Sequence, residues 1–269
     1  MRKSLLLLTF ILSLLFTPPA LASTHFKDVD NVNHAYAIPS INFMVDKGIL
    51  SGYDDGTFKP DRYVDKSEFT LMIYKLFDKL RRSSNPCLDS NSKFEYADVP
   101  AGHWARKPIL DIYGLDATGV VELRGDLPPY FHPDTQITRW DALHMLGYVL
   151  KGTGIGYDDT MALEIVMNLK LKDIKIKRVE PNTIISYNSA DKTIYYDDTR
   201  EHFGFDCGFS DDYDTIRYIA YMVGAKIMST WNGKLEVNDK ITRAQAVVLL
   251  HRLYNEVKSV GYLSPISSK

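Results

Sequence analysis

The sequence lacks any long hydrophobic run beyond its first 22 residues. The early run, from Leu5 to Phe16, has 12 residues, whereas a membrane-spanning helix needs about 20. Arg2 and Lys3 precede this run, and Ala20-Leu21-Ala22 follows it with the small-residue pattern that signal peptidase cleaves. We therefore predict a signal peptide at residues 1–22, in preference to an uncleaved anchor, and an exported mature chain.

Cysteine is scarce, and positive charge is not in excess. The two cysteines, Cys87 and Cys207, stand 120 residues apart, which is no zinc-ligand spacing and excludes a metal-thiolate site. An exported setting permits a bond between them, so a disulfide and two unpaired thiols both remain open. Loss of residues 1–22 leaves 30 Lys and Arg against 34 acids, a net charge of −4. Nothing in this balance suggests a nucleic-acid partner, which requires a basic face.

Internal repetition is what the sequence does contain. Phe58-Lys59-Pro60-Asp61 matches Phe131-His132-Pro133-Asp134, and the residue six positions after each Phe is β-branched. Ile241 likewise stands six positions after Leu235. Three related strings follow: Val64-Asp65-Lys66-Ser67-Glu68, Ile137-Thr138-Arg139-Trp140-Asp141 and Ile241-Thr242-Arg243-Ala244-Gln245. We infer three copies of one unit.

Each copy is expected to form a helix, a loop and a second helix. Apolar residues recur at helical spacing in both helices of each copy. Gly48, Gly119 or Gly224 is expected to end the first helix in a left-handed conformation. Asp65 with Glu68, Thr138 with Asp141 and Thr242 with Gln245 are expected to cap the second helix. A unit of about fifty residues cannot cover its own apolar face, so the fold class is mainly α with three packed units.

The first residue of each second helix is a cation: Lys66, Arg139 or Arg243. This position disfavours positive charge by roughly 0.3 to 1 kcal/mol because of the helix dipole. The cation, together with free first-turn amides, predicts a site for a carboxylate or phosphate. A solvated surface Arg, or a salt bridge to a nearby Asp, is the alternative for a single helix.

At these residues the chain resembles the S-layer homology family. The resemblance covers most of residues 26–80 and 94–151, plus 209–257. It is carried by Phe26-Lys27-Asp28-Val29, by His103-Trp104-Ala105, by the loop from Gly48 to Phe58, and by Ile241-Thr242-Arg243-Ala244-Gln245. It implies a pseudo-threefold helical assembly whose inter-repeat grooves bind secondary cell wall polysaccharide, often bearing pyruvate ketals.

The resemblance also supplies the candidate binding residues, which are weighted towards the two arginines because a lysine lacks the two-pronged geometry of Arg. The aromatic members are candidates for stacking on sugar rings or for packing. The full set is Arg243, Arg139, Lys66, Thr242, Thr138, Trp104, Tyr53 and Trp231. Trp140 stands where the family has a small residue, which is expected to reshape the second groove.

The domain organisation follows from these copies. We expect repeat 1 at 23–81, a linker at 82–93, repeat 2 at 94–151, an insertion at 152–208, repeat 3 at 209–257 and a flexible tail at 258–269. The insertion is predicted to hold a helix at 160–170 and a β-hairpin of strands 183–187 and 192–196. In an alternative register, the 160–170 helix is the first helix of repeat 3 and the hairpin lies within that repeat.

The leading functional hypothesis is a non-catalytic module that anchors to anionic wall polysaccharide, without a cofactor. An adaptor that recruits another exported protein through the insertion is the alternative. A wall-active hydrolase using His202, Cys207 and the acids at 197, 198, 206, 211 and 212 is a third. No calcium loop with its terminal Glu and no phosphate-binding glycine loop is present.

Overall fold

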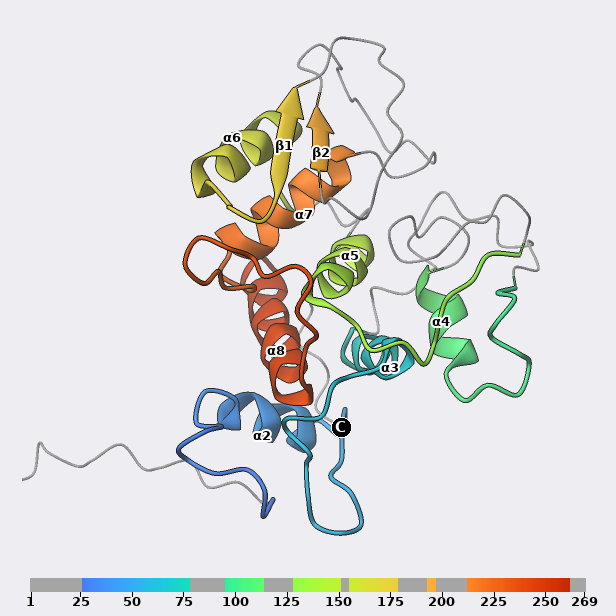
Figure 1. The fold of residues 1–269 in the computed structure, drawn as a ribbon. Helices are drawn as coiled ribbons and strands as arrows, with labels where there is room; N and C mark the ends of the chain where they lie inside the picture. The colour runs from blue at the N-terminus through green and yellow to red at the C-terminus, as the bar shows by residue number, and fades with distance from the viewer. Residues whose placement is uncertain are drawn as a thin grey trace, which may run out of the picture.

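The computed structural model describes residues 26–77, 95–113, 128–150, 155–178, 193–196 and 212–261. The described chain is mainly helical, as expected (Figure 1). The signal peptide, the linker and both cysteines lie outside the described residues. The elements are α2 (Ile38–Asp46), α3 (Lys66–Leu76), α4 (Arg106–Tyr113), α5 (Arg139–Leu150), α6 (Asp159–Leu169), β1 (Lys175–Arg178), β2 (Thr193–Tyr196), α7 (Asp212–Gly224) and α8 (Arg243–Ser259).

One aspartate clamps the loop before each of the helices α3, α5 and α8. Asp28 accepts hydrogen bonds from the backbone N–H groups of Phe58 and Lys59, both at 2.8 Å. Asp98 accepts from Phe131 and His132 at 2.8 and 2.7 Å. Asp173 accepts from Leu235 and Glu236 at 2.9 and 2.6 Å. Each clamp stands near the start of a stretch of chain. We name these stretches the first segment (26–77), the second segment (95–150) and the third segment (171–261).

Asp173 gives the third segment a start that resembles the start of the first. Leu171-Lys172-Asp173-Ile174 stands where Phe26-Lys27-Asp28-Val29 stands in the first segment, because both aspartates hold the same part of the following loop. We infer that the stretch from Leu171 also belongs to the third segment, ahead of the predicted repeat start at residue 209. On this inference β1 and β2 lie inside the segment, and α6 precedes it.

The backbones of the three segments are joined in a closed ring of hydrogen bonds. The N–H of Val64 donates to the carbonyl of Ile241 at 3.2 Å, and that of Ile241 donates to Ile137 at 3.1 Å. The N–H of Ile137 donates to Val64 at 3.0 Å, which closes the ring. All three side chains are at most 1% exposed, so this junction lies in the core.

Each second helix packs against the first helix of another segment. α3 contacts α4, α5 contacts α7, and α8 contacts α2. In Figure 1, α3, α5 and α8 lie in the middle of the molecule, and α2, α4 and α7 lie around them. The predicted apolar faces point into this core: Phe69, Met72, Ile73, Leu76, Phe77, Ala142, Leu143, Leu146, Val247, Leu250 and Leu253 are all buried. Val149 is predicted on the same face, but its side chain is not among those that the structure describes.

One local prediction stays untested, and one is wrong. β2 forms at the predicted strand 192–196 and pairs with β1 in parallel, whereas the other strand of the expected hairpin (183–187) lies outside the described residues, so the hairpin stays a prediction. Gly224 is the last residue of α7 and is not in the left-handed region; Lys226 is, with φ 58°. Gly48 does adopt the predicted conformation, with φ 67°.

α8 also extends beyond its predicted end. It continues to Ser259, two residues into the expected tail. No helix in the described part of the chain is both long and apolar enough to cross a bilayer.

Candidate functional site

The first-turn amides of the three second helices are not free, contrary to the sequence-based expectation. In α3, Lys66 and Ser67 donate to the carbonyls of Thr135 and Pro133, both at 2.9 Å. The first two amides of α5 donate to Asp239 and Val237 of the third segment, and those of α8 donate to Arg62 and Pro60 of the first segment. The helix starts are therefore used to join segments and do not offer an open anion site.

The capping predictions are confirmed. Thr138 Oγ1 accepts from the Asp141 N–H at 3.2 Å, and Asp141 Oδ2 accepts from the Thr138 N–H at 2.7 Å. Thr242 and Gln245 form the same pair, and Glu68 accepts from the Asp65 N–H at 3.2 Å. The two threonines thus fix the helix starts; whether they also touch a ligand is a separate prediction.

Arg243 reaches from α8 into the loop of the first segment. Its Nη2 donates to the carbonyl of Ser51 at 2.9 Å. The guanidinium carbon lies 4.7 Å from the ring centre of Phe58 and 5.4 Å from that of Tyr53. Arg243 is 6% exposed, and its Nε is buried without a hydrogen-bond partner. Burial lowers the pKa of this guanidinium.

Arg139 makes the equivalent contacts from α5 to the third segment. Its Nε donates to the carbonyl of Leu235 at 2.6 Å, and its Nη2 donates to the carbonyl of Ser229 at 2.5 Å. Burial lowers its pKa as well. Among the described residues, no carboxylate pairs with Arg139 or Arg243 within 4.0 Å. Arg243 is therefore held by two rings and a carbonyl oxygen, and Arg139 by two carbonyl oxygens.

Lys66 occupies the corresponding place in α3. Its Nζ lies 4.6 Å from the ring centre of Phe131 in the second segment, and the residue is 9% exposed. Burial lowers the pKa of Lys66 from 10.5 to about 8, although the carboxylates of Asp141 and Asp98 oppose this shift. All three predicted cations thus lie at contacts between segments.

The aromatic candidates fall into two groups. Tyr53 is partly buried and packs against Arg243, so the structure brings these two predicted site residues together. Trp104 and Trp231 are 57% and 68% exposed, and Trp104 stacks on His103 with ring centres 5.7 Å apart. Trp140 is 5% exposed and packs against His144, so it belongs to the core of the α5–α7 contact.

Tyr36 is an exposed aromatic side chain that the sequence patterns did not identify as a candidate. Tyr36 is 54% exposed and directly precedes the buried Ala37, as Trp104 precedes the buried Ala105. The carbonyls of Ala37 and Ala105 each accept a hydrogen bond from the N–H of the isoleucine four residues later, Ile41 or Ile109. Counting back five positions from these isoleucines aligns Tyr36 with Trp104.

The candidates for catalysis cannot be placed. His202, Cys207 and the acids at 197, 198, 206 and 211 lie outside the described residues, and only the backbone of Asp212 is described. Within the described ranges, no group of three or more His, Cys, Asp or Glu side chains is arranged to hold a metal ion.

These features define a mainly helical protein in which buried cations bridge matching helix starts and loops. The family profile of the S-layer homology domain matches residues 25–70 and 208–247. The two matches fall on the first and third segments, and the second match begins close to the predicted repeat start at residue 209.

Similar proteins come from several bacteria. The chain is 28% identical over 130 residues to a cellulosome-anchoring protein of Acetivibrio thermocellus, covering 48% of this chain and 27% of that protein. It is 31% identical over 130 residues to S-layer protein EA1 of Bacillus anthracis, covering 48% and 13%. It is 29% identical over 197 residues to an S-layer protein of Bacillus licheniformis, covering 68% and 21%. The chain thus spans less than a third of each of these relatives.

Proposed function

We propose that this protein is a non-catalytic module of the bacterial cell surface that binds anionic, pyruvylated wall polysaccharide. The S-layer homology matches and the relatives, which are S-layer and cellulosome-anchoring proteins, support a location at the cell wall or S-layer. We also propose a pseudo-threefold assembly of three repeats. The ring through Val64, Ile137 and Ile241 supports it, as do the three aspartate clamps.

The observation that carries the proposal is the state of the two guanidinium groups. A charge taken out of water costs several kcal/mol unless it is paired. Arg139 and Arg243 are held at equivalent places by carbonyl groups, without a described carboxylate partner. Acidic side chains act on these cations without pairing with them: Glu236, Asp239 and Asp173 on Arg139, and Glu68 on Arg243. A ligand carboxylate would supply a countercharge in direct contact and would match the two-pronged geometry of Arg. A ketal-linked pyruvate carries such a group.

The remaining candidates have supporting roles in this proposal. Lys66 gives a weaker site because its ammonium is a point charge. Thr138 and Thr242 hold the helix starts beside the cations, Tyr53 supports Arg243, and the exposed rings of Trp104 and Trp231 stack on sugars.

Binding of purified, pyruvylated wall polymer to the mature chain tests the proposal. Arg243→Lys keeps the charge but removes the planar fork, so we expect affinity to fall about tenfold. Arg252→Lys is the matched control, because Arg252 is exposed on the same helix. Arg243→Ala is expected to lose more affinity than Lys66→Ala.

Chemically depyruvylated polymer is the second arm of this experiment. It should bind the native chain as weakly as intact polymer binds Arg243→Lys. Equal binding of both polymers would defeat the proposal. So would an Arg243→Lys protein that is less stable yet binds normally, because Arg243 would then be only a structural contact.

A further inference from the structure

An exposed basic surface lies on the third segment, outside the contacts made by Arg139 and Arg243. The stretch from residue 170 to 178 contains five cations and one acid. All five cations are exposed: Lys170, Lys172, Lys175, Lys177 and Arg178. The acid, Asp173, has both carboxylate oxygens occupied by the loop amides that it clamps. Positive charge therefore dominates this stretch although the whole chain is slightly acidic.

The alternation of β1 arranges part of this charge in a line. Ile174 is buried and Ile176 is partly buried against the core, so Lys175 and Lys177 point to the other face. Residues two apart on one strand face are about 6.6 Å apart. The parallel register sets Lys177 beside Tyr195, with Nζ 5.9 Å from the ring centre.

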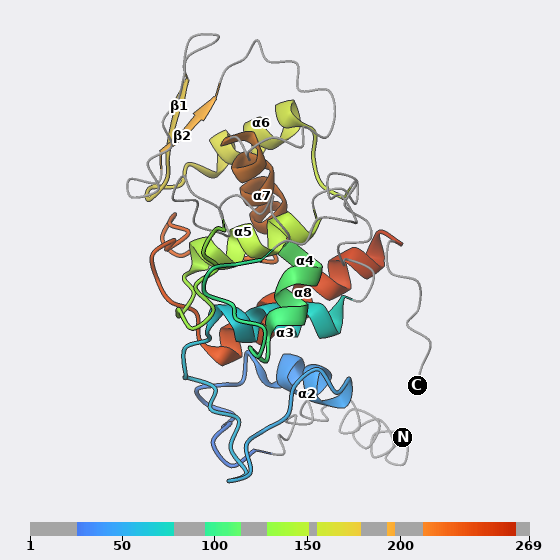
Figure 2. The same cartoon turned by 90° about the vertical axis from the view of Figure 1, so that its right-hand side faces the viewer.

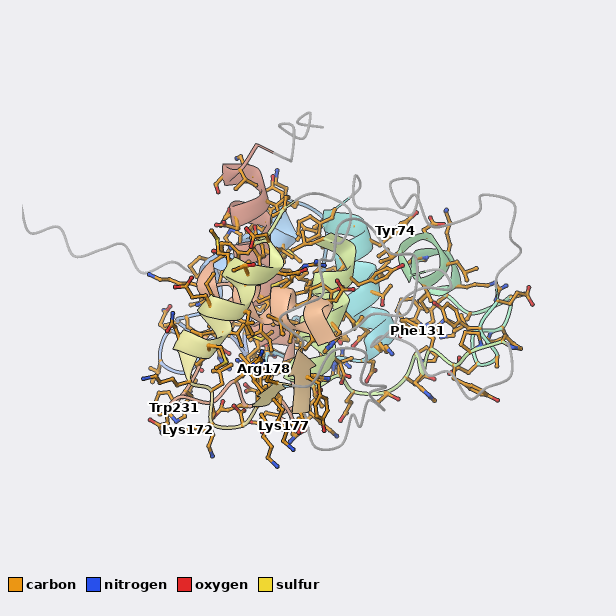
Figure 3. The ribbon with its side chains drawn as sticks, turned by 90° about the horizontal axis from the view of Figure 1, so that it is seen from above. Tyr74, Phe131, Lys172, Lys177, Arg178 and Trp231 are labelled. Atoms are coloured by element: carbon orange, nitrogen blue, oxygen red, sulfur yellow. The ribbon has the colours of Figure 1, made fainter. Side chains whose placement is uncertain are left out.

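The surface continues onto the turn that carries Trp231. The N–H of Lys172 donates to the carbonyl of Gly233 at 2.9 Å, so the two stretches are in contact. Trp231 and Lys234 close this turn with two backbone hydrogen bonds of 2.8 Å, and both are exposed. In Figure 3, Lys172, Trp231 and Lys177 lie towards the lower edge of the molecule. We name the six cations and Trp231 the basic strand surface.

This surface adjoins the partly buried Arg139. Arg139 binds the carbonyls of Ser229 and Leu235, and Trp231 lies between these two residues in the chain. A ligand that reaches Arg139 along this loop would therefore pass Trp231 and the row of lysines.

We propose that the basic strand surface binds a linear, phosphate-linked polyanion of the cell wall. Lysines are mobile point charges that suit repeated phosphates, in contrast to the fixed fork of a buried Arg. Exposed Trp231 offers a stacking face for a sugar or polyol unit. A lipid surface suits these residues less, because it requires apolar side chains that can insert. The isoleucines at 174 and 176 point inward, which leaves Trp231 as the large apolar side chain that the basic strand surface exposes. The wall location rests on the proposed function.

The test uses purified poly(glycerol phosphate), which has no pyruvate, so its outcome is independent of binding at Arg243. The mature chain and Lys175→Gln/Lys177→Gln are compared by titration at several salt concentrations. We expect the double substitution to weaken binding about tenfold and to reduce the slope of log K against log salt by about 1 to 2. Lys47→Gln/Lys258→Gln removes two exposed charges elsewhere and should change neither value.

Three further arms separate the alternatives. Neutral dextran should not bind. Vesicles of phosphatidylglycerol and phosphatidylcholine should bind more weakly than the polymer, and stronger vesicle binding overturns the proposal in favour of a membrane surface. Equal loss in the two double variants also overturns it, because the effect would then be one of net charge. Arg243→Lys should bind poly(glycerol phosphate) like the native chain, which keeps this outcome distinct from the proposed function.

Discussion

At the scale of single residues, Lys66 shows the cost of placing a cation between segments. Its ammonium is nearly buried against Phe131, and its pKa falls to about 8. Between pH 8 and 10.5 the unfolded chain keeps the proton and the folded chain has lost it. The unfolded state then binds more protons, so Lys66 makes stability rise with pH across this window.

Substitution of Lys66 tests this pH dependence. The free energy of unfolding of the native chain, minus that of Lys66→Met, should increase by about 2 to 3 kcal/mol between pH 7.5 and 10.5. Denaturant titrations of both proteins at each pH measure it. Lys47→Met, at an exposed position, should give a difference that stays flat. A flat difference for Lys66→Met would show that its ammonium is well solvated.

The end of α7 gives a second prediction at this scale. Lys226 adopts φ 58°, which costs a residue with a Cβ about 1 kcal/mol relative to Gly. Lys226→Gly should therefore raise the free energy of unfolding by about 0.5 to 1 kcal/mol, measured by thermal and denaturant unfolding.

Two glycine substitutions serve as controls for Lys226→Gly. Gly48→Ala, at φ 67°, should destabilise the protein by about 1 kcal/mol. Gly224→Ala should be neutral or stabilising, because its Cβ would meet Tyr157 only at an ordinary contact distance of 3.4 Å. A large loss for Gly224→Ala would restore Gly224 as the left-handed stop that the sequence suggested.

At the scale of elements, the clamping aspartate decides where the third segment begins. Asp173→Ala removes an acceptor from the N–H groups of Leu235 and Glu236, and Leu235 is fully buried. A buried N–H without a partner costs about 1 to 3 kcal/mol. Asp173→Ala should therefore destabilise the protein by about 2 kcal/mol, as Asp98→Ala should, in denaturant unfolding.

Asp54 provides the comparison, because it is exposed in the turn of the first segment. Asp54→Ala should change stability by less than about 0.5 kcal/mol. If Asp173→Ala behaves like Asp54→Ala, the clamp of the third segment is dispensable and the inferred start at Leu171 is wrong.

The second helix of each segment could be predicted from the sequence, because its start and its buried face depend on local chemistry. The positions of α3, α5 and α8 follow from their caps and apolar spacing, which depend on residues within one turn. The cations Lys66, Arg139 and Arg243 were found for the same reason, since each stands next to a cap. Trp104 and Trp231 are exposed as a stacking role requires.

The features that were not predicted have a common physical cause. They depend on partners far away in the chain, which local sequence patterns do not identify. The first-turn amides of α8 bond to Pro60 and Arg62, nearly two hundred residues earlier. β1, which no local pattern predicted, pairs with β2, whose partner residues lie 18 positions further along the chain. The clamp by Asp173 was not predicted because β1 and β2 separate Asp173 from α7 in the sequence, whereas Asp98 stands close to α4.

At the scale of the whole molecule, the contacts between segments form a cycle. α3 packs on α4, α5 on α7 and α8 on α2, while the cation at the start of each second helix enters the same neighbouring segment. Figure 2 shows α3, α5 and α8 together across the middle of the molecule, with α2 at one end and α7 towards the other. No segment can therefore unfold without exposing an apolar face and breaking hydrogen bonds of another.

This closure predicts that the amides of Val64, Ile137 and Ile241 exchange with deuterium in a single cooperative step. Each lies in a different segment and donates to another, so all three should open only on global unfolding, with equal exchange free energies. The Trp231 amide, in an exposed turn, should exchange much faster. Asp98→Ala should lower the protection of all three ring amides equally, because destabilising one segment destabilises the ring. Loss of protection at Ile137 alone would mean that the segments open independently and that the closed ring does not couple them.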